Sequence, residues 1–382
     1  MPVLPQPTTI LQVLPRLESG GVERGTVEMV QAIAGAGGRA LVASAGGRLV
    51  ASVERAGGAH IVLPLASKGP LTIWRNVGRL AEVAQREHVA IIHARSRAPA
   101  WSAMWAARRA GVPFVTTYHA PYSEDAPGKR RYNSVMARGE RVIAISRYIA
   151  NLIVARHGTD PARIRVIPRG VDTALFDPAR VVPDRLARLT RAWRLPDDAP
   201  VVLLPARLSR WKGQDVLLKA MALLQHPTAV CVMVGDGSAV YTKELLNTAH
   251  ALGVAERLRL VGHCEDMPAA LMLATVAVSA STKPEGFGRA VIEAQAMGCA
   301  VVATNHGGAA ETVEDLVTGW HVPPGDAQAL AAVLSHALGM SDGDRVALGE
   351  RSRASVLRDY TTAAMQAATL EVYGEVLASS AK

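Results

Sequence analysis

Residues 283–293 read KPEGFGRAVIE and follow, after two intervening residues, an apolar run at residues 276–280. The apolar run predicts a buried strand, and Pro284 with the glycines after it predicts a turn. The residues beyond Gly288 have helical character. A strand, a glycine turn and the start of a helix form an anion site, because the first N–H groups of a helix have no partner within it.

Two glutamates flank this turn, Glu285 before it and Glu293 inside the predicted helix. Apolar residues surround Glu293 along the chain, and burying a carboxylate is costly unless it accepts hydrogen bonds. A lone glutamate of this kind is more often a satisfied structural residue at a packing site. The second glutamate and the glycine turn favour a binding site instead.

Working outward, short apolar strands alternate with helical stretches over the whole chain. This alternation predicts an α/β protein with parallel, doubly wound sheets. The expected strands of the first half are residues 10–14, 41–44, 60–63, 90–93, 113–117, 142–146 and 164–172, and those of the second half are residues 201–204, 230–234, 258–262, 276–280 and 300–303.

The predicted domains are residues 1–180, residues 181–360 and a closing helical segment at residues 361–382 that crosses back to the first domain. The stretch from Asp177 to Pro200 is rich in Pro, Asp and Arg, which predicts a linker. Two helices are expected after Asp326. With 382 residues, two domains of ordinary size can each bury a core.

Composition narrows the functional classes. A formal net charge of +9 points to anionic partners, whereas only 4% aromatic residues leave few stacking platforms for single-stranded nucleic acid. The three cysteines, Cys231, Cys264 and Cys299, have no CxxC spacing, which argues against a disulfide framework or a zinc site. No signal-peptide pattern precedes Leu17 and no apolar run is long enough for a membrane span, so we expect a cytoplasmic protein.

Polar and glycine residues gather at successive strand ends in the second half. The cations Arg207 and Lys212 follow the strand at 201–204, and both suit a diphosphate. Either alone could be an exposed surface cation. Glycines follow the later strands, at Gly235, Gly237, Gly262, Gly307 and Gly308. Together with the helix start near Gly288, these features indicate nucleotide diphosphate binding, with Glu293 placed to accept from ribose hydroxyls.

Fewer candidates occur in the first half. Gly20-Gly21 lies between the first strand and a helix, where a ligand can approach the backbone closely, although a tight turn explains it equally well. His119 follows the strand at 113–117 and could carry a proton, bind a sugar hydroxyl or be structural. A basic run follows, which is either a solvated face or a docking surface for anionic lipid head groups or an acidic acceptor: Lys129, Arg130, Arg131, Arg138, Arg141 and Arg147.

At these residues the chain resembles a known family. The Glu-x7-Glu stretch at Glu285 and Glu293 resembles the motif of retaining glycosyltransferases of the GT-B fold, family 4, and residues 207–213 (RLSRWKG) resemble its Arg…Lys-Gly motif. Residues 20–24 (GGVER), 118–120 (YHA) and 167–172 (IPRGVD) match its amino-terminal blocks. The chain departs from the pattern at Ala206, where Gly is usual, and at Cys299-Ala300, where Pro often precedes the next strand.

The resemblance implies two Rossmann-like domains facing across a cleft and a donor site in the second. Glu285 would contact donor-sugar hydroxyls, Glu293 the ribose, and Arg207 with Lys212 the diphosphate. His119 would line the reaction centre, and Gly20 with Gly21 would lie close to donor phosphate or acceptor. The other donor-binding residues implied are Gly235, Gly262, Gly286, Phe287 and Gly288. The family needs no divalent metal, so neither metal nor cofactor is expected.

The implied reaction moves a hexose from a nucleotide-diphosphate sugar to a glycan or glycolipid acceptor, in lipopolysaccharide or other cell-envelope polysaccharide synthesis. Net charge and family habit suggest peripheral association with an anionic inner membrane face. An NAD-dependent oxidoreductase is the first alternative, weakened because Val240 stands where GxGxxG needs its third glycine. The others are a nucleic-acid binder, a sugar-nucleotide epimerase and a sugar-phosphate synthase. The base (UDP, GDP or ADP), the acceptor and the oligomeric state are left open.

Overall fold

The computed structural model describes residue 4, residues 7–18 and residues 20–380. It divides into two compact units, which we describe separately. Unit 1 comprises residues up to Pro168 together with residues from Thr362 onward, and unit 2 comprises Arg169–Thr361. The division falls earlier than the predicted boundary after residue 180, and the closing helix counts with unit 1.

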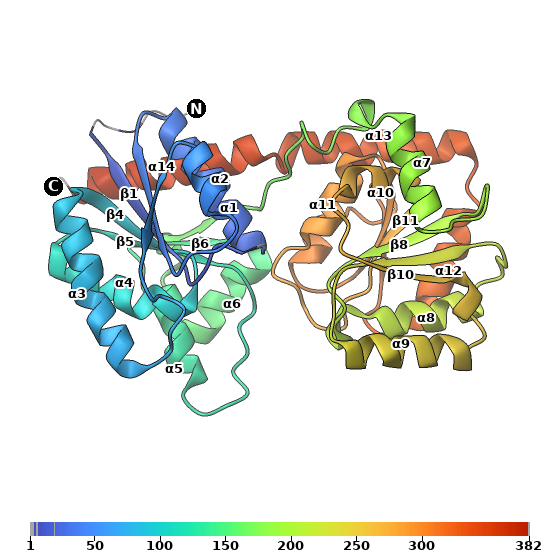
Figure 1. Ribbon diagram of the computed structural model, residues 1–382, viewed down its shortest axis with the longest axis horizontal. Coiled ribbons are helices and arrows are strands. Elements are labelled where there is room, and N and C mark those ends of the chain that lie inside the picture. The colour runs from blue at the N-terminus through green and yellow to red at the C-terminus, as the bar shows by residue number, and fades with distance from the viewer. Residues whose placement is uncertain (1–3, 5–6, 19, 381–382) are drawn as a thin grey trace. The chain divides into compact units, whose positions relative to one another are not determined.

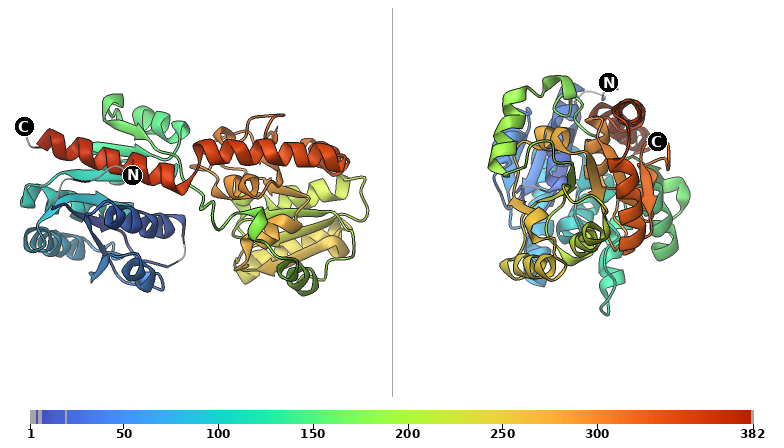
Figure 2. Two further views of the ribbon diagram at one scale, coloured as in Figure 1. Left: turned by 90° about the horizontal axis from the view of Figure 1, so that it is seen from above. Right: turned by 90° about the vertical axis from the view of Figure 1, so that its right-hand side faces the viewer.

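Unit 1 is built on a seven-stranded sheet in the order β3-β2-β1-β4-β5-β6-β7, and every adjacent pair is parallel. Helices cover both faces of this sheet (Figure 2). Its strands are β1 (Thr9–Val13), β2 (Arg39–Ser44), β3 (Ala59–Val62), β4 (Val89–Ala94), β5 (Phe114–Tyr118), β6 (Arg141–Ala144) and β7 (Ile164–Val166). Its helices are α1 (Gly21–Gly35), α2 (Val50–Arg55), α3 (Pro70–Arg86), α4 (Arg97–Ala110), α5 (Lys129–Asn133), α6 (Arg147–His157) and α14 (Thr362–Ser380), with 3-10 turns η1 (Ser134–Ala137) and η2 (Pro161–Arg163).

Unit 2 has a six-stranded parallel sheet in the order β10-β9-β8-β11-β12-β13. Its strands are β8 (Val201–Pro205), β9 (Val230–Val234), β10 (Leu258–Gly262), β11 (Val276–Ser279), β12 (Ala300–Thr304) and β13 (Trp320–Val322). Its helices are α7 (Pro183–Ala192), α8 (Gln214–Leu223), α9 (Ala239–Ala251), α10 (Met267–Leu273), α11 (Arg289–Ala296), α12 (Ala327–Leu338) and α13 (Asp342–Asp359), with 3-10 turns η3 (Pro178–Arg180), η4 (Arg210–Lys212), η5 (Ala255–Arg257) and η6 (Gly308–Glu311).

The helices of unit 2 form two layers. α8, α9 and α12 lie on one face of the sheet, and α7, α10, α11 and α13 lie on the other (Figure 1). Buried apolar side chains of β8, β9 and β11, such as Leu204, Met233 and Val278, join α8 and α12 in one core cluster. Both sheets reverse their winding beside the first strand of the unit, between β1 and β4 and between β8 and β11. The predicted α/β class with two doubly wound sheets is confirmed.

Three sequence-based expectations about elements are wrong. The predicted linker at 177–200 contains α7, which packs on α10 and whose Arg185 Nε donates to Asp266 Oδ2 at 2.8 Å. Pro183 is the first residue of that helix, a position where proline is favoured rather than disruptive. Three helices, not two, follow Asp326, and the predicted strand at 164–172 ends at Val166.

The last helix belongs to unit 1 through a buried polar network. His93 on β4 makes two ring-nitrogen hydrogen bonds of 2.7 Å, one with the Tyr373 hydroxyl of α14 and one with the Thr117 hydroxyl of β5. Burial raises the pKa of Tyr373, so its hydroxyl stays protonated. Glu375, two residues further along α14, pairs with Arg141 of β6 and Arg165 of β7. These contacts hold α14 against the sheet.

Candidate active site

A small cavity lies at the carboxyl ends of β8 and β11, where the winding of the unit 2 sheet reverses. Such a position is where open parallel sheets bind ligands. The cavity has a volume of about 170 Å³ and is lined by Leu204, Pro205, Ala206, Lys212, Val278, Ser279, Ala280, Ser281, Glu285, Gly288, Arg289 and Ala290. It is smaller than the roughly 300–1,000 Å³ of a site for a whole drug-sized ligand, so it fits one portion of such a molecule.

Lys212 reaches this cavity because of the loop that follows β8. The loop ends at Gly213, whose φ is 75°, and a Cβ there would lie 1.9 Å from the Ala280 carbonyl oxygen. Only glycine lets the loop approach the end of β11 this closely. The Lys212 ammonium lies 4.5 Å from the Trp211 ring centroid and 2.7 Å from Glu285 Oε1. The predicted cation and the predicted carboxylate therefore meet inside one cavity.

The side-chain amide of a buried residue, Gln214, stabilises the same loop. Gln214 is buried, and its Nε2 donates to the Arg207 carbonyl oxygen at 3.1 Å. Its Oε1 accepts from the Tyr241 hydroxyl at 3.4 Å. Burial, followed by the nearby Asp215 carboxylate, raises the pKa of Tyr241 to about 12, so this hydroxyl keeps its proton. The loop's path is fixed by side chains outside the cavity.

Glu285 is oriented by its neighbours as well. The Ser281 hydroxyl donates to Glu285 Oε1, and the Ser281 carbonyl oxygen lies 2.7 Å from His306 Nε2. The Gly308 N–H donates to the Glu285 carbonyl oxygen at 2.8 Å, and a Cβ on Gly308 would lie 2.2 Å from the Gly286 carbonyl oxygen. The predicted Gly307-Gly308 turn thus packs under the Glu285 turn and supports it.

The helix after this turn begins at the cavity wall. Gly288 is the N-cap of α11 with a φ of 91°, and no side chain caps the helix. The first backbone N–H groups of α11 therefore have no side-chain acceptor from the cap residue. Arg289, the first residue of α11, lines the cavity, and its Nε lies 3.5 Å from Glu293 Oε1 one turn later. The site therefore holds two ion pairs, Lys212–Glu285 and Arg289–Glu293.

Several predicted donor residues lie outside the cavity lining. Arg207 is exposed, and Gly235 packs under it, since a Cβ there would lie 2.4 Å from the Ala206 carbonyl oxygen. The Gly235 N–H donates to the Gly262 carbonyl oxygen at 2.7 Å. Phe287 is 4% exposed and packs edge-on against Tyr360, with 5.8 Å between the ring centroids. The glycines and Phe287 have structural contacts that shape the strand ends.

Glu293 contacts the cavity through Arg289 rather than by lining it, and 13% of its side chain is exposed. Sequence reasoning missed Arg289 and Ser281, which line the cavity and bond the two predicted glutamates. Their signal was present in the spacing, since each lies four residues before its glutamate. Residues four apart on a helix face one another, so Arg289 could have been found.

The unit 1 candidates lie at the carboxyl edge of its own sheet. Gly20 is the N-cap of α1, and a Cβ there would lie 2.3 Å from Glu23 Oε2, so the glycine lets this carboxylate fold back over the helix start. Gly21 is the first residue of α1. His119 directly follows β5, is partly buried, and its N–H lies 3.4 Å from the Tyr122 hydroxyl oxygen.

Comparisons with known proteins identify the family of this chain. Residues 187–355 match the family described as Glycosyl transferases group 1, and residues 19–175 match Glycosyltransferase Family 4. A D-inositol 3-phosphate glycosyltransferase of Xylanimonas cellulosilytica is 35% identical over 289 residues, which cover 71% of this chain and 68% of that protein. The chain belongs to the group 1, family 4 glycosyltransferases.

Solved structures extend the family likeness to the fold. A glycosyltransferase from Rickettsia africae is 36% identical, with a TM-score of 0.90 and coverage of 97% of this chain and 99% of that one. Anabaena HepE, solved with UDP and glucose, is 26% identical, with a TM-score of 0.85 and coverage of 96% and 100%. Among the described residues, no helix of this glycosyltransferase is both long and apolar enough to cross a membrane.

Proposed function

We propose that this glycosyltransferase moves a hexose from a nucleotide-diphosphate sugar, with retention of anomeric configuration, to a glycan or glycolipid acceptor. The Lys212–Glu285 pair, 2.7 Å apart inside the unit 2 cavity, is the observation that supports it most. A cation and a carboxylate side by side suit the two halves of such a donor. The cation faces the diphosphate, and the carboxylate faces the sugar hydroxyls.

The second ion pair supports the same placement of the donor. Arg289 lies at the first turn of α11, and the start of a helix favours an anion. In this proposal Lys212, Arg289 and the helix start hold the diphosphate, Glu285 binds donor-sugar hydroxyls and Glu293 accepts from the ribose. Arg207, exposed above Gly235, reaches the outer phosphate oxygens. Gly235, Gly262, Gly286, Phe287 and Gly288 shape the donor side.

The chemistry of this reaction lies in the departing diphosphate. The bond from the anomeric carbon to the phosphate oxygen breaks, the acceptor oxygen bonds to the same face of that carbon, and the acceptor's proton passes to the leaving diphosphate. Negative charge grows on the phosphate as the sugar becomes oxocarbenium-like, so cations here stabilise the transition state more than the bound donor. We propose that they do so without a divalent metal, with His119 at the reaction centre and Gly20-Gly21 near phosphate or acceptor.

A structural neighbour and the net charge support a choice of nucleotide and acceptor. HepE binds UDP and glucose, which favours a UDP-hexose donor. The net charge of +9 favours an acceptor presented at an anionic membrane surface, as in cell-envelope or lipopolysaccharide synthesis on the cytoplasmic face. Binding to anionic vesicles no tighter than to neutral ones would count against the membrane part.

A thermal-shift screen of UDP, GDP, ADP and their sugar conjugates tests the donor assignment. A ligand at 100 times its dissociation constant stabilises the folded protein by about 2.7 kcal/mol, which is readily measured. We expect a shift with one nucleotide that is diminished in Glu293→Ala and retained in Glu371→Ala, an exposed glutamate on α14. Absence of any shift in the folded protein would overturn the proposal.

A further inference from the structure

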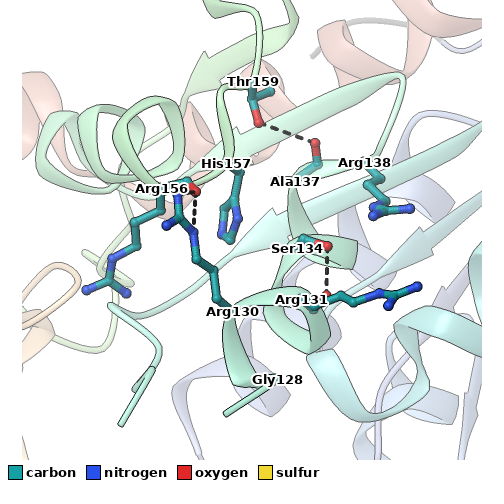
Figure 3. A pocket seen from close by; sticks show the side chains of 9 residues that line it. All are labelled: Gly128, Arg130, Arg131, Ser134, Ala137, Arg138, Arg156, His157 and Thr159. Carbon is teal, nitrogen blue, oxygen red and sulfur yellow. Dashed lines mark hydrogen bonds between the residues drawn. The ribbon is translucent and has the colours of Figure 1, made fainter. Parts of the chain in front are cut away.

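A cavity in unit 1 lies in a groove between α5, η1 and the end of α6. Its volume is about 530 Å³ and its charged side chains are Arg130, Arg131, Arg138 and Arg156, joined by His157. Figure 3 shows His157 in the middle of the pocket, with Arg131 and Arg138 extended together on one side. No carboxylate lines it.

The arginines of this pocket differ from three other arginines of unit 1 in what they bind. Arg39 pairs with Glu87, and Arg141 and Arg165 both pair with Glu375, so each of these three has a carboxylate partner. The pocket arginines are held mainly by backbone oxygens and by a ring. Arg130 donates to the Arg156 carbonyl oxygen, Arg156 Nη1 donates to the Tyr122 carbonyl oxygen at 2.7 Å, and Arg138 stacks 5.2 Å from the Trp101 ring centroid.

Carboxylates near the pocket supply little compensation. Glu124 lies 3.8 Å from Arg156, and Asp125 is already paired with Lys129 at 2.7 Å. Among the described residues, Arg131 has no side-chain hydrogen bond or ion pair, and its carbonyl oxygen accepts from Ser134. Burial lowers the pKa of His157, Glu124 opposes this shift, and the surrounding arginines add to it, so the imidazole is mainly neutral at pH 7. The pocket therefore carries four guanidinium groups, of which, in the part of the chain that the structure describes, only Arg156 has a carboxylate within 4 Å.

Each guanidinium carries five N–H donors in a planar fork that matches phosphate oxygens. The few backbone bonds described above use only some of these donors, which leaves others to bind an anion in the groove. We propose that this pocket binds phosphate groups, as a second anion site separate from the donor cavity of unit 2. The phosphate could belong to a lipid head group or to a soluble phosphorylated compound, and both present the same oxygens.

Two tryptophans lie on the neighbouring helix α4, and the first of them, Trp101, contacts the pocket residue Arg138. Trp101 on α4 donates from Nε1 to the Tyr132 carbonyl oxygen at 3.0 Å, between α4 and α5. Trp105, one turn further along α4, is half-exposed and lies under Arg108, 4.8 Å from its ring centroid to the guanidinium carbon. Exposed tryptophan beside arginine suits the head-group level of a membrane.

The double variant Arg131→Gln/Arg138→Gln tests the site and should fold, because neither side chain bonds a carboxylate. Arg55→Gln/Arg75→Gln removes the same charge from exposed positions on α2 and α3 and is the matched control. One arm measures stabilisation by inorganic pyrophosphate with the donor site saturated by UDP. The other measures sedimentation with phosphatidylcholine vesicles, with and without phosphatidylglycerol.

We expect the pocket variant to bind at least one of these probes about tenfold or more weakly than the control variant does, since charge-assisted forks are lost. Loss in the vesicle arm alone identifies a lipid head group, and loss in the pyrophosphate arm alone identifies a soluble phosphate compound. Equal binding by the two variants in both arms, or no binding by the unaltered protein, overturns the inference. The UDP shift is read in the same samples, so failure of the donor proposal is seen separately.

Discussion

Lys212→Met is the substitution that tests the donor site most directly. Methionine keeps the apolar stem over the Trp211 ring, 4.5 Å from the ammonium, and removes only the charge. Glu285 retains the hydroxyl of Ser281 as a donor. We therefore expect Lys212→Met to fold normally and to weaken mainly the interaction with a bound anion.

The burial of the pair sets the size of the effect. The side chains of Lys212 and Glu285 are 19% and 14% exposed, so solvent screens the ammonium only in part. Two unit charges about 4 Å apart attract by about 4 kcal/mol at an effective dielectric constant of about 20. Part of this attraction already acts on the diphosphate of the bound donor, so only the remainder lowers the barrier. Loss of one such donor typically costs about 2.7–4 kcal/mol in the barrier, or roughly 10²–10³ in turnover.

The assay is the initial rate of sugar transfer at saturating donor, using the nucleotide sugar with the largest thermal shift. Lys219→Met on α8 is the control, since Lys219 is 57% exposed and 3.8 Å from Asp215. We expect turnover to fall in Lys212→Met and to stay normal in Lys219→Met. Near-normal turnover in Lys212→Met would refute the assignment of this lysine to the leaving group.

Three further predictions concern the fold and the metal. Gly111→Ala lowers the free energy of unfolding by about 1–2 kcal/mol, because alanine is strained in the left-handed backbone conformation there. Gly213→Ala lowers it further, because the added Cβ also clashes with the Ala280 carbonyl oxygen. Equal melting temperatures of the two variants would contradict this prediction. Glu375→Gln destabilises unit 1 by about 1 kcal/mol after allowance for solvent screening. Because Arg141 lowers the pKa of Glu375, that difference is full above about pH 4.3 and shrinks as denaturant titrations go to lower pH; a constant difference would contradict it. EDTA leaves transfer unchanged, and a loss restored by Mg²⁺ would contradict the metal-independent proposal.

Local sequence patterns predicted the strands well, because each buried parallel strand is a short apolar run bounded by turn residues. β8, β9 and β11 match runs in the sequence closely. Helices with mixed faces were harder to predict. α7 begins at a proline and carries several charged residues, so its composition resembled a linker, and only its packing on α10 shows what stabilises it. Its Arg185–Asp266 pair joins residues far apart in sequence.

The donor cavity was predictable in its residue types but not in its pairings. Strand order brings β8 beside β11 although β9 and β10 come between them in the chain. That crossover is what places Lys212 against Glu285. Arg207, equally prominent in the sequence, is exposed and does not line the cavity. The sequence motif predicts both cations, and the strand order of the sheet is what brings Lys212 rather than Arg207 to the cavity.

The basic run of unit 1 is a second case in which the residue types were predictable from the sequence but their pairings were not. Arg141 belongs to the run, yet Glu375 of α14 neutralises it from the far end of the chain. Arg156 lies outside the run, yet the end of α6 brings it into the pocket with Arg130. A count of basic residues along the sequence therefore includes Arg141, which is paired with a carboxylate, and leaves out Arg156, which lines the pocket. An anion responds to the charge left after pairing, so substitution of the pocket arginines, three of them from the run together with Arg156, should change phosphate binding, and substitution of Arg141 should not.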